Sequence, residues 1–278
     1  MNDLPTPPSP LPSPEESAAP AGGTAPAGLP PPQRGGRSGR PWGFWATLGW
    51  AALWLAVFLG TGMVFCLVAV VVLAAMGQVS DIVQGAEALA TNGLLLGLVA
   101  VAQVPIMVGL TALLAWIRMP VSAYLGLRWP GYRQTAVGLV ALLALIVGQD
   151  ALSWSLGRPI VAEFMLTAYR TAAFLPVLVV ALLVAAPVVE EVFFRGFMYK
   201  GLAASKVGPA GAILITSLVW AAIHLQYDAY GMGLIFTAGI LLGLVRWRTK
   251  SVLLPILLHG MINAVATVQT IVVAEGWA

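Results

Sequence analysis

Long apolar runs separated by short polar connectors constrain this chain more than any other feature of its sequence. Seven runs follow residue 41, at about 45–76, 92–117, 135–157, 172–203, 209–225, 231–247 and 252–274. A transmembrane helix needs about 20 consecutive apolar residues. Only 9% of the residues are charged, against about 25% in soluble domains. The pattern predicts an all-α polytopic membrane protein with about seven transmembrane helices.

The first 41 residues have a different composition, with 12 of the 20 prolines and few apolar side chains. Such a segment cannot bury enough surface to offset its chain entropy. We therefore expect residues 1–41 to be a disordered, Pro-rich tail and residues 42–278 to form one membrane domain.

Basic residues gather in alternate connectors, which predicts the orientation of the chain in the membrane. The basic groups are Arg34, Arg37 and Arg40; Arg118, Arg128 and Arg133; Lys200 and Lys206; and Arg246, Arg248 and Lys250. Only the connector with Arg158 and Arg170 departs from the alternation. The prediction is a multi-pass protein of the cell membrane with a cytoplasmic N-terminus. The net charge of +3 reflects this topology, so the expected partner is the lipid bilayer and no nucleic acid.

Three charged residues, Glu190, Glu191 and Arg195, lie inside the fourth apolar run. A charged group in the middle of a span costs roughly 2.5–3.5 kcal/mol on insertion scales and indicates function. Glu191 and Arg195 are one helical turn apart and can pair. Glu190 points about 100° away and has no such partner in its own helix. Pro187, one turn earlier, is expected to kink the helix or leave the Leu183 carbonyl open.

Two later runs carry the chain's only histidines, each one turn from a second notable side chain: Trp220 with His224, and His259 with Asn263. Counted at ~1.5 Å per residue from a shared hairpin, Glu190 and His224 reach the same depth. The fifth and sixth runs look too short to cross the bilayer fully. We expect the polar groups to meet in a water-accessible, cytoplasm-facing cavity.

A carboxylate in such a cavity can act as a general base on water. A histidine and an asparagine one turn apart can donate hydrogen bonds to a developing oxyanion. Glu190, His224, His259 and Asn263 therefore suit amide hydrolysis by water without a cofactor. In the alternative interpretation Glu190, His224 and His259 hold a zinc ion. The HExxH motif of the common metalloproteases does not occur in this sequence.

The segments EEVFFRG (190–196), WAAIH (220–224) and HGMIN (259–263) occur in this order on successive apolar runs. Together they resemble the CPBP family, which comprises CAAX prenyl endopeptidases of the Ras-converting type and bacteriocin-processing or self-immunity proteins. The resemblance covers roughly residues 172–270. One departure is Trp220, where the family more often has phenylalanine.

The resemblance implies an intramembrane endopeptidase that acts on a membrane-associated protein or peptide through a non-covalent intermediate. It gives Glu190 the role of general base assisted by His224, and it makes His259 and Asn263 the oxyanion site. Glu191 and Arg195 would support these groups. It leaves metal dependence open.

Two other functions fit the same residues. One is a non-catalytic scaffold or immunity protein with the protease fold, and the other is a transporter that relays protons through Glu190. Three further interpretations concern packing and position. Gly93–Gly97 and Gly239–Gly243 are expected to be sites of close helix packing, and Asp150 is expected at the membrane interface.

Overall fold

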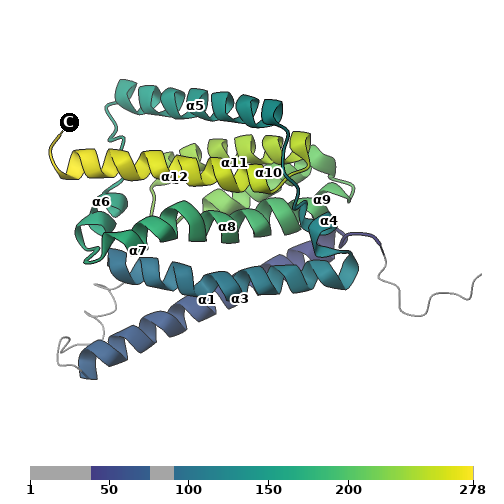
Figure 1. The fold of residues 1–278 in the computed structure, drawn as a ribbon, viewed down its shortest axis with the longest axis horizontal. Helices are drawn as coiled ribbons and strands as arrows, with labels where there is room; N and C mark the ends of the chain where they lie inside the picture. Colours follow the sequence, from purple (N-terminus) through teal and green to yellow (C-terminus); the bar gives the residue numbers. More distant parts are fainter. Residues whose placement is uncertain (1–38, 76–90, 278) are drawn as a thin grey trace, which may run out of the picture. The chain divides into compact units, whose positions relative to one another are not determined.

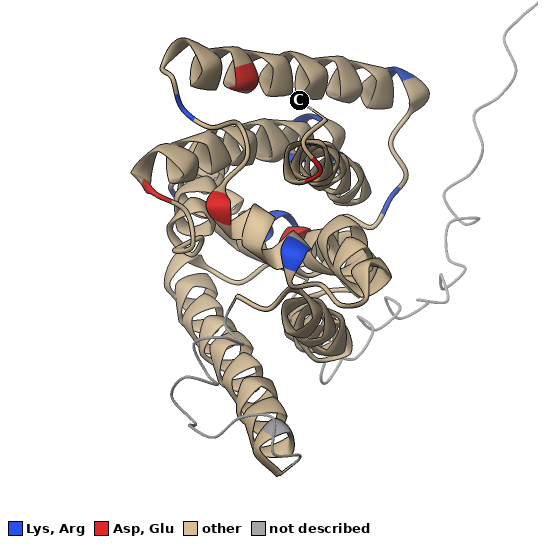
Figure 2. Ribbon diagram, turned by 90° about the vertical axis from the view of Figure 1, so that its left-hand side faces the viewer, with Lys and Arg blue, Asp and Glu red and all other residues tan. Residues whose placement is uncertain are grey.

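The computed structural model describes residues 39–75 and 91–277, and these residues form helices and connectors without a β-strand (Figure 1). The predicted tail lies outside the described residues except for its last three positions. Charged positions are few along the helices (Figure 2). The all-α polytopic class is confirmed.

Six helices in the described residues are long and apolar enough to cross a membrane. They are α1 (Phe44–Ala75), α3 (Gly93–Arg118), α5 (Tyr132–Ser155), the helix of residues 175–203, α11 (Ala229–Thr249) and α12 (Leu253–Ala274). The remaining predicted span, the fifth along the chain, is α10 (Gly208–Ala222), which has 15 residues and is shorter. The expectation that the sixth span is too short was wrong, because α11 has 21 residues. Two short helices, α4 (Val121–Leu125) and α6 (Glu163–Arg170), lie in connectors.

The helix of residues 175–203, here called the central helix, changes its hydrogen-bond pattern along its length. Its parts are α7 (Leu175–Val180), the π-helical η1 (Ala181–Ala185), α8 (Ala186–Glu191), the π-helical η2 (Val192–Met198) and α9 (Tyr199–Ala203). A π-helical turn bonds residue i to i+5 and is frequent at functional sites. Here the two π-helical segments flank the turn that carries Glu190 and Glu191.

Glycines allow neighbouring helices to approach closely, as the two GxxxG segments predict. A Cβ atom on Gly97 would lie 3.1 Å from the backbone nitrogen of Leu178 in the central helix. A Cβ atom on Gly243 would lie 2.8 Å from the Ile213 side chain in α10. Both distances are shorter than ordinary van der Waals contact, so larger residues would push these helices apart.

One end of the helix bundle, which we call the basic end, contains three connectors that carry Lys or Arg residues. These are residues 119–131, 204–207 and 250–252. The backbone N–H of Val252 donates to the Gly126 carbonyl, and the Ser251 hydroxyl donates to the Arg128 carbonyl. The Trp42 indole donates to the Leu114 carbonyl near the end of α3. These bonds bring connectors 119–131 and 250–252 and the start of α1 together.

The opposite end, which we call the α6 end, contains α6, the α10–α11 connector and the C-terminal residues. An ion pair of 2.7 Å joins Arg158 to Asp228, and the Tyr169 hydroxyl donates to Glu275. Figure 1 shows α6 and the C-terminus at one end of the helices and α4 and α9 at the other.

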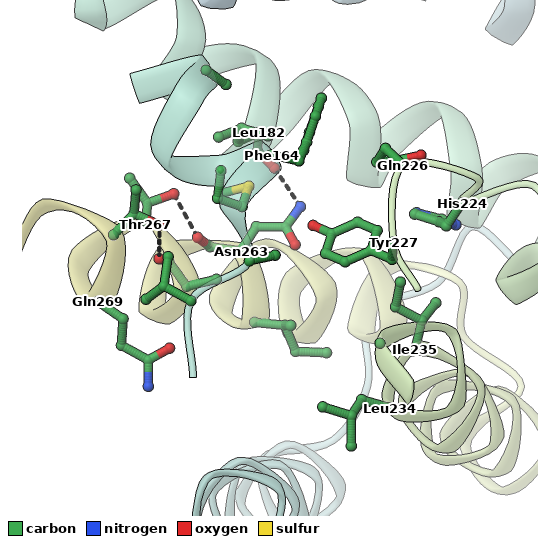
Figure 3. Close-up of a pocket in the computed structure, with 18 of the residues that line it drawn as sticks. Phe164, Leu182, His224, Gln226, Tyr227, Leu234, Ile235, Asn263, Thr267 and Gln269 are labelled. Atoms are coloured by element: carbon green, nitrogen blue, oxygen red, sulfur yellow. Dashed lines mark hydrogen bonds between the residues drawn. The ribbon is translucent and has the colours of Figure 1, made fainter. Parts of the chain in front are cut away.

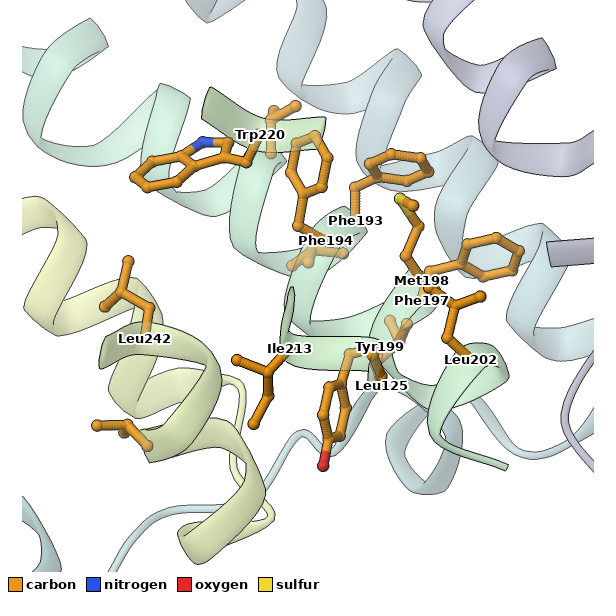
Figure 4. Close-up of a cluster of buried hydrophobic side chains, with 14 of the residues drawn as sticks. Leu125, Phe193, Phe194, Phe197, Met198, Tyr199, Leu202, Ile213, Trp220 and Leu242 are labelled. Atoms are coloured by element: carbon orange, nitrogen blue, oxygen red, sulfur yellow. The ribbon is translucent and has the colours of Figure 1, made fainter. Parts of the chain in front are cut away.

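A cluster of buried apolar side chains fills the basic end around the second half of the central helix (Figure 4). All seven residues of η2 are buried. The rings of Phe193 and Trp54 stack with centroids 3.8 Å apart, so Phe193 packs against α1. The cluster includes Phe193, Phe194, Phe197, Met198, Tyr199, Leu202, Ile213, Trp220 and Leu242.

Candidate active site

Glu191 and Arg195 form a fully buried ion pair, as their spacing predicts. Arg195 Nη1 donates to Glu191 Oε1 at 2.7 Å, and neither side chain is exposed to solvent. The same oxygen lies 3.0 Å from His259 Nδ1 in α12. An ionised carboxylate can only accept hydrogen bonds, so His259 Nδ1 is the donor and Nε2 remains for other partners. Glu191 therefore orients His259 from the central helix.

Glu190 is half-buried and turns away from the Glu191–Arg195 pair. Its Oε2 accepts a hydrogen bond of 2.5 Å from the Trp220 indole in α10, and no other described residue donates to this carboxylate. Arg195 lies over the Trp220 ring, 4.5 Å from the centroid. Trp220 therefore contacts both the unpaired acid Glu190 and the arginine of the buried pair, a role that the sequence pattern did not predict.

His224 lies just beyond the C-terminal end of α10, because the helix stops at Ala222. Its Nδ1 is 2.7 Å from the Trp220 carbonyl. A carbonyl only accepts, so Nδ1 donates and also satisfies one of the open carbonyls at the helix end. The predicted spacing to Trp220 is retained, although His224 itself is not helical. In the neutral ring its Nε2 then has a free lone pair and can accept a hydrogen bond.

Asn263 binds a backbone carbonyl of the central helix. Its Nδ2 donates to the Leu182 carbonyl at 2.7 Å. In the π-helical pattern this carbonyl would bond the nitrogen of Pro187, which carries no hydrogen. The carbonyl satisfied by a side chain is thus one residue earlier than the sequence predicted, because η1 shifts the pattern by one position. Gly260 lies against Leu183, since a Cβ atom there would be 2.7 Å from the Leu183 carbonyl oxygen.

A cavity of about 670 Å³ reaches into the helices, and the four predicted catalytic residues Glu190, His224, His259 and Asn263 all line it (Figure 3). The two predicted supporting residues, Glu191 and Arg195, do not line it. The structure therefore separates the six residues into a group that faces the cavity and a buried pair behind it.

The cavity runs from Glu190 to the α6 end. In the central helix its walls are Leu175, Leu178, Val179, Ala181, Leu182, Ala186 and Glu190. All of these residues precede η2, and the residues after Glu191 are packed in the apolar cluster. The cavity was expected to face the cytoplasm, on the side of the basic connectors, but its lining residues lie toward the α6 end. The depths of Glu190 and His224 along their helices do not indicate that aromatic residues after Glu191 close the basic end.

The three motifs can now be compared with known proteins. Residues 172–265 match the family model described as type II CAAX prenyl endopeptidase Rce1-like. The matched segment contains all three motifs and every residue discussed above from Trp220 to Asn263. Residues 172–265 are thus similar to the CPBP/CAAX protease family. No curated protein and no solved structure gives a match to the chain.

The structure adds two cavity residues that the motifs did not identify. Tyr227 lies between the rings of His224 and Phe164, each 6.2 Å away between centroids. Figure 3 shows its hydroxyl pointing toward Asn263. Burial, and then the nearby Glu190 carboxylate, raise the pKa of Tyr227, which favours the neutral phenol. Asp150, expected at the interface, lines the cavity and accepts from Gln269 at 2.7 Å.

The alternative set of zinc ligands comprises Glu190, His224 and His259. Within the described ranges, no three His, Cys, Asp or Glu side chains lie together as metal ligands would. Nδ1 of His224 and Nδ1 of His259 each donate to an acceptor and leave Nε2 free, as in metal-binding histidines, so only the spacing of the side chains speaks against the site. The described side chains therefore do not fit a three-ligand metal site.

Proposed function

We propose that this protein is an endopeptidase in which Glu190 activates a water molecule to hydrolyse a peptide bond of a membrane-associated protein or peptide. One observation carries the proposal. Glu190 faces the cavity and forms no ion pair with a described residue, while the adjacent acid Glu191 pairs with the only arginine in the central helix. A carboxylate that no cation neutralises can serve as a general base.

The proposed reaction begins when Glu190 removes a proton from water and the water oxygen bonds to the carbonyl carbon of the substrate. Hydrogen-bond donors around the carbonyl oxygen of the substrate stabilise the negative charge that develops on it. Asn263 uses one N–H for Leu182, and its second N–H is available to the oxyanion. His259, held by Glu191, is the second candidate donor through protonated Nε2.

The intermediate then breaks down as the carbon–nitrogen bond cleaves and Glu190 passes its proton to the leaving amine. His224, fixed through Nδ1, presents Nε2 to the cavity and assists the proton transfer to and from water. Atoms balance without a cofactor: one water is consumed, and one carboxylate and one amine are formed.

The test compares wild type with Glu190→Gln by mass spectrometry of membrane-associated peptides. Asp150→Asn is the matched control, because it neutralises another acid that lines the same cavity. The proposal expects peptides whose cleavage is lost in Glu190→Gln and kept in Asp150→Asn. If no cleavage depends on Glu190 while the cellular phenotype survives the substitution, the scaffold interpretation replaces the proposal. The metal content of the purified protein is measured in parallel.

A further inference from the structure

We propose that the cavity opens on the outer, non-cytoplasmic face of the membrane, and that its substrates are polypeptide segments that reach it from that face. The substrate part of this inference rests on the proposed protease function. The orientation part does not, because it follows from where the charges and the cavity lie in the fold.

The distribution of basic residues between the two ends is strongly unequal. Of the 14 Lys and Arg residues, 11 lie before α1 or in and beside the connectors of the basic end. Two, Arg158 and Arg170, belong to the α6 end, and Arg195 is buried in the central helix. Lys and Arg remain on the cytoplasmic side of membrane proteins. The basic end is therefore the cytoplasmic end.

The mouth of the cavity lies at the other end. Its lining includes residues 158–165 before and within α6 and residues 226–228 of the α10–α11 connector. In α5 the lining residues, among them Ser153, lie in the half nearer to α6, and in α12 they run from His259 to Thr270. From this mouth to Glu190 the central helix runs 15 residues, or about 22 Å at 1.5 Å per residue.

The cytoplasmic side of the site is closed by packing. Phe193, Phe194 and Phe197 are each at most 2% exposed, as is Leu202 one turn further on. Water or peptide coming from the basic end would have to displace this cluster, whereas the cavity offers a continuous path from the α6 end. Access from the outer side follows from both the charges and the closed core.

The residues that line the cavity also indicate which substrate segments it can accommodate. Four acids, Asp150, Glu163, Glu190 and Asp228, line the cavity. Arg158 is the only Lys or Arg among the lining residues, and Asp228 pairs with it. The remaining walls are mainly apolar. An extended, apolar segment with basic residues complements these charges better than an acidic one.

Single-cysteine labelling tests the orientation without requiring activity. Cys66 is the chain's only cysteine, so Cys66→Ser gives a cysteine-free background. Glu163→Cys and Gln226→Cys report on the mouth, while Trp129→Cys and Lys206→Cys report on the basic end; all four positions are exposed. A membrane-impermeant maleimide is applied to spheroplasts and to inverted vesicles. We expect the mouth positions to react in spheroplasts and the basic-end positions in inverted vesicles. The reverse pattern overturns the orientation.

The substrate part is tested with a quenched fluorescent peptide, apolar with flanking lysines, and a matched peptide with flanking glutamates. We expect hydrolysis of the lysine peptide by spheroplasts and not by sealed inverted vesicles, and at least tenfold slower hydrolysis of the glutamate peptide. The signal should disappear in Glu190→Gln. Hydrolysis only by inverted vesicles overturns the inference. Outward labelling of the mouth with no Glu190-dependent hydrolysis on either side contradicts the proposed function and leaves the orientation intact.

Discussion

Removing Arg195 should strongly destabilise the protein, because its charge balances a carboxylate that no solvent reaches. Glu191 and Arg195 are 0% exposed and 2.7 Å apart. Arg195→Met would leave the Glu191 carboxylate with only His259 as a partner. Breaking a buried pair by removing one member costs about 3–5 kcal/mol. We expect a loss of this size in the free energy of unfolding.

The loss should be recovered in part when the partner acid is removed as well. In Glu191→Leu/Arg195→Met no buried charge remains unpaired, so the double variant should be more stable than the sum of the two single changes predicts. Residues in one network typically couple by about 0.5–3 kcal/mol. Unfolding in detergent, followed by circular dichroism, gives the values. Additive effects, or a loss below about 1 kcal/mol in Arg195→Met, would refute the reasoning that burial makes this pair indispensable.

The ion pair between Arg158 and Asp228 is the matched control. It has the same 2.7 Å separation, but its side chains are 47% and 58% exposed, so Arg158→Met should change stability little. The Gly231 N–H, and then Arg158, hold the pKa of Asp228 below its usual range. Any stability from this group is present above the unfolded pKa of about 3.9 and is lost as pH falls through the lower folded value. The small difference between variant and wild type should vanish under strongly acidic conditions.

Two further substitutions test how the site is held. Trp220→Phe removes the indole donor to Glu190 but keeps an aromatic ring. We expect kcat for peptide hydrolysis to fall about tenfold with little change in KM, because a hydrogen bond to a charged group contributes about 1.5–3 kcal/mol. An unchanged kcat would contradict this role of Trp220. Gly260→Ala should separate α12 from the Leu183 carbonyl and lower stability by about 1–3 kcal/mol, as judged by melting in detergent. Gly148→Ala, which meets no atom within 4 Å, should not lower it.

The sequence predicted the helices well, because apolar runs of membrane length have few alternative structures. It also predicted the separation of Glu190 from the Glu191–Arg195 pair, since positions four apart on a helix share a face. Both predictions rest on local periodicity, which tertiary packing rarely overrides in a membrane.

The contacts between helices were less predictable. The π-helical segment η1 makes Leu182, and not Leu183, the residue whose carbonyl lacks a backbone donor. No local sequence pattern predicts this change. The end of the helix bundle toward which the cavity extends was also predicted wrongly. The depth of Glu190 along its helix does not indicate which end of the helix is closed by Phe193 and its neighbours. Tyr227 was missed because its role depends on a connector that folds back over the site.

The central claim, that Glu190 is the base that activates water, is tested most directly by hydrolysis with purified protein. Wild type, Glu190→Gln and Asp150→Asn are compared in liposomes on a peptide that the wild type cleaves, after equal melting behaviour of the three proteins has been established. The account predicts a fall in kcat of at least 100-fold in Glu190→Gln, at the low end of what a general base contributes, and a change within a few fold in Asp150→Asn. Glu190→Gln with wild-type kcat would contradict it.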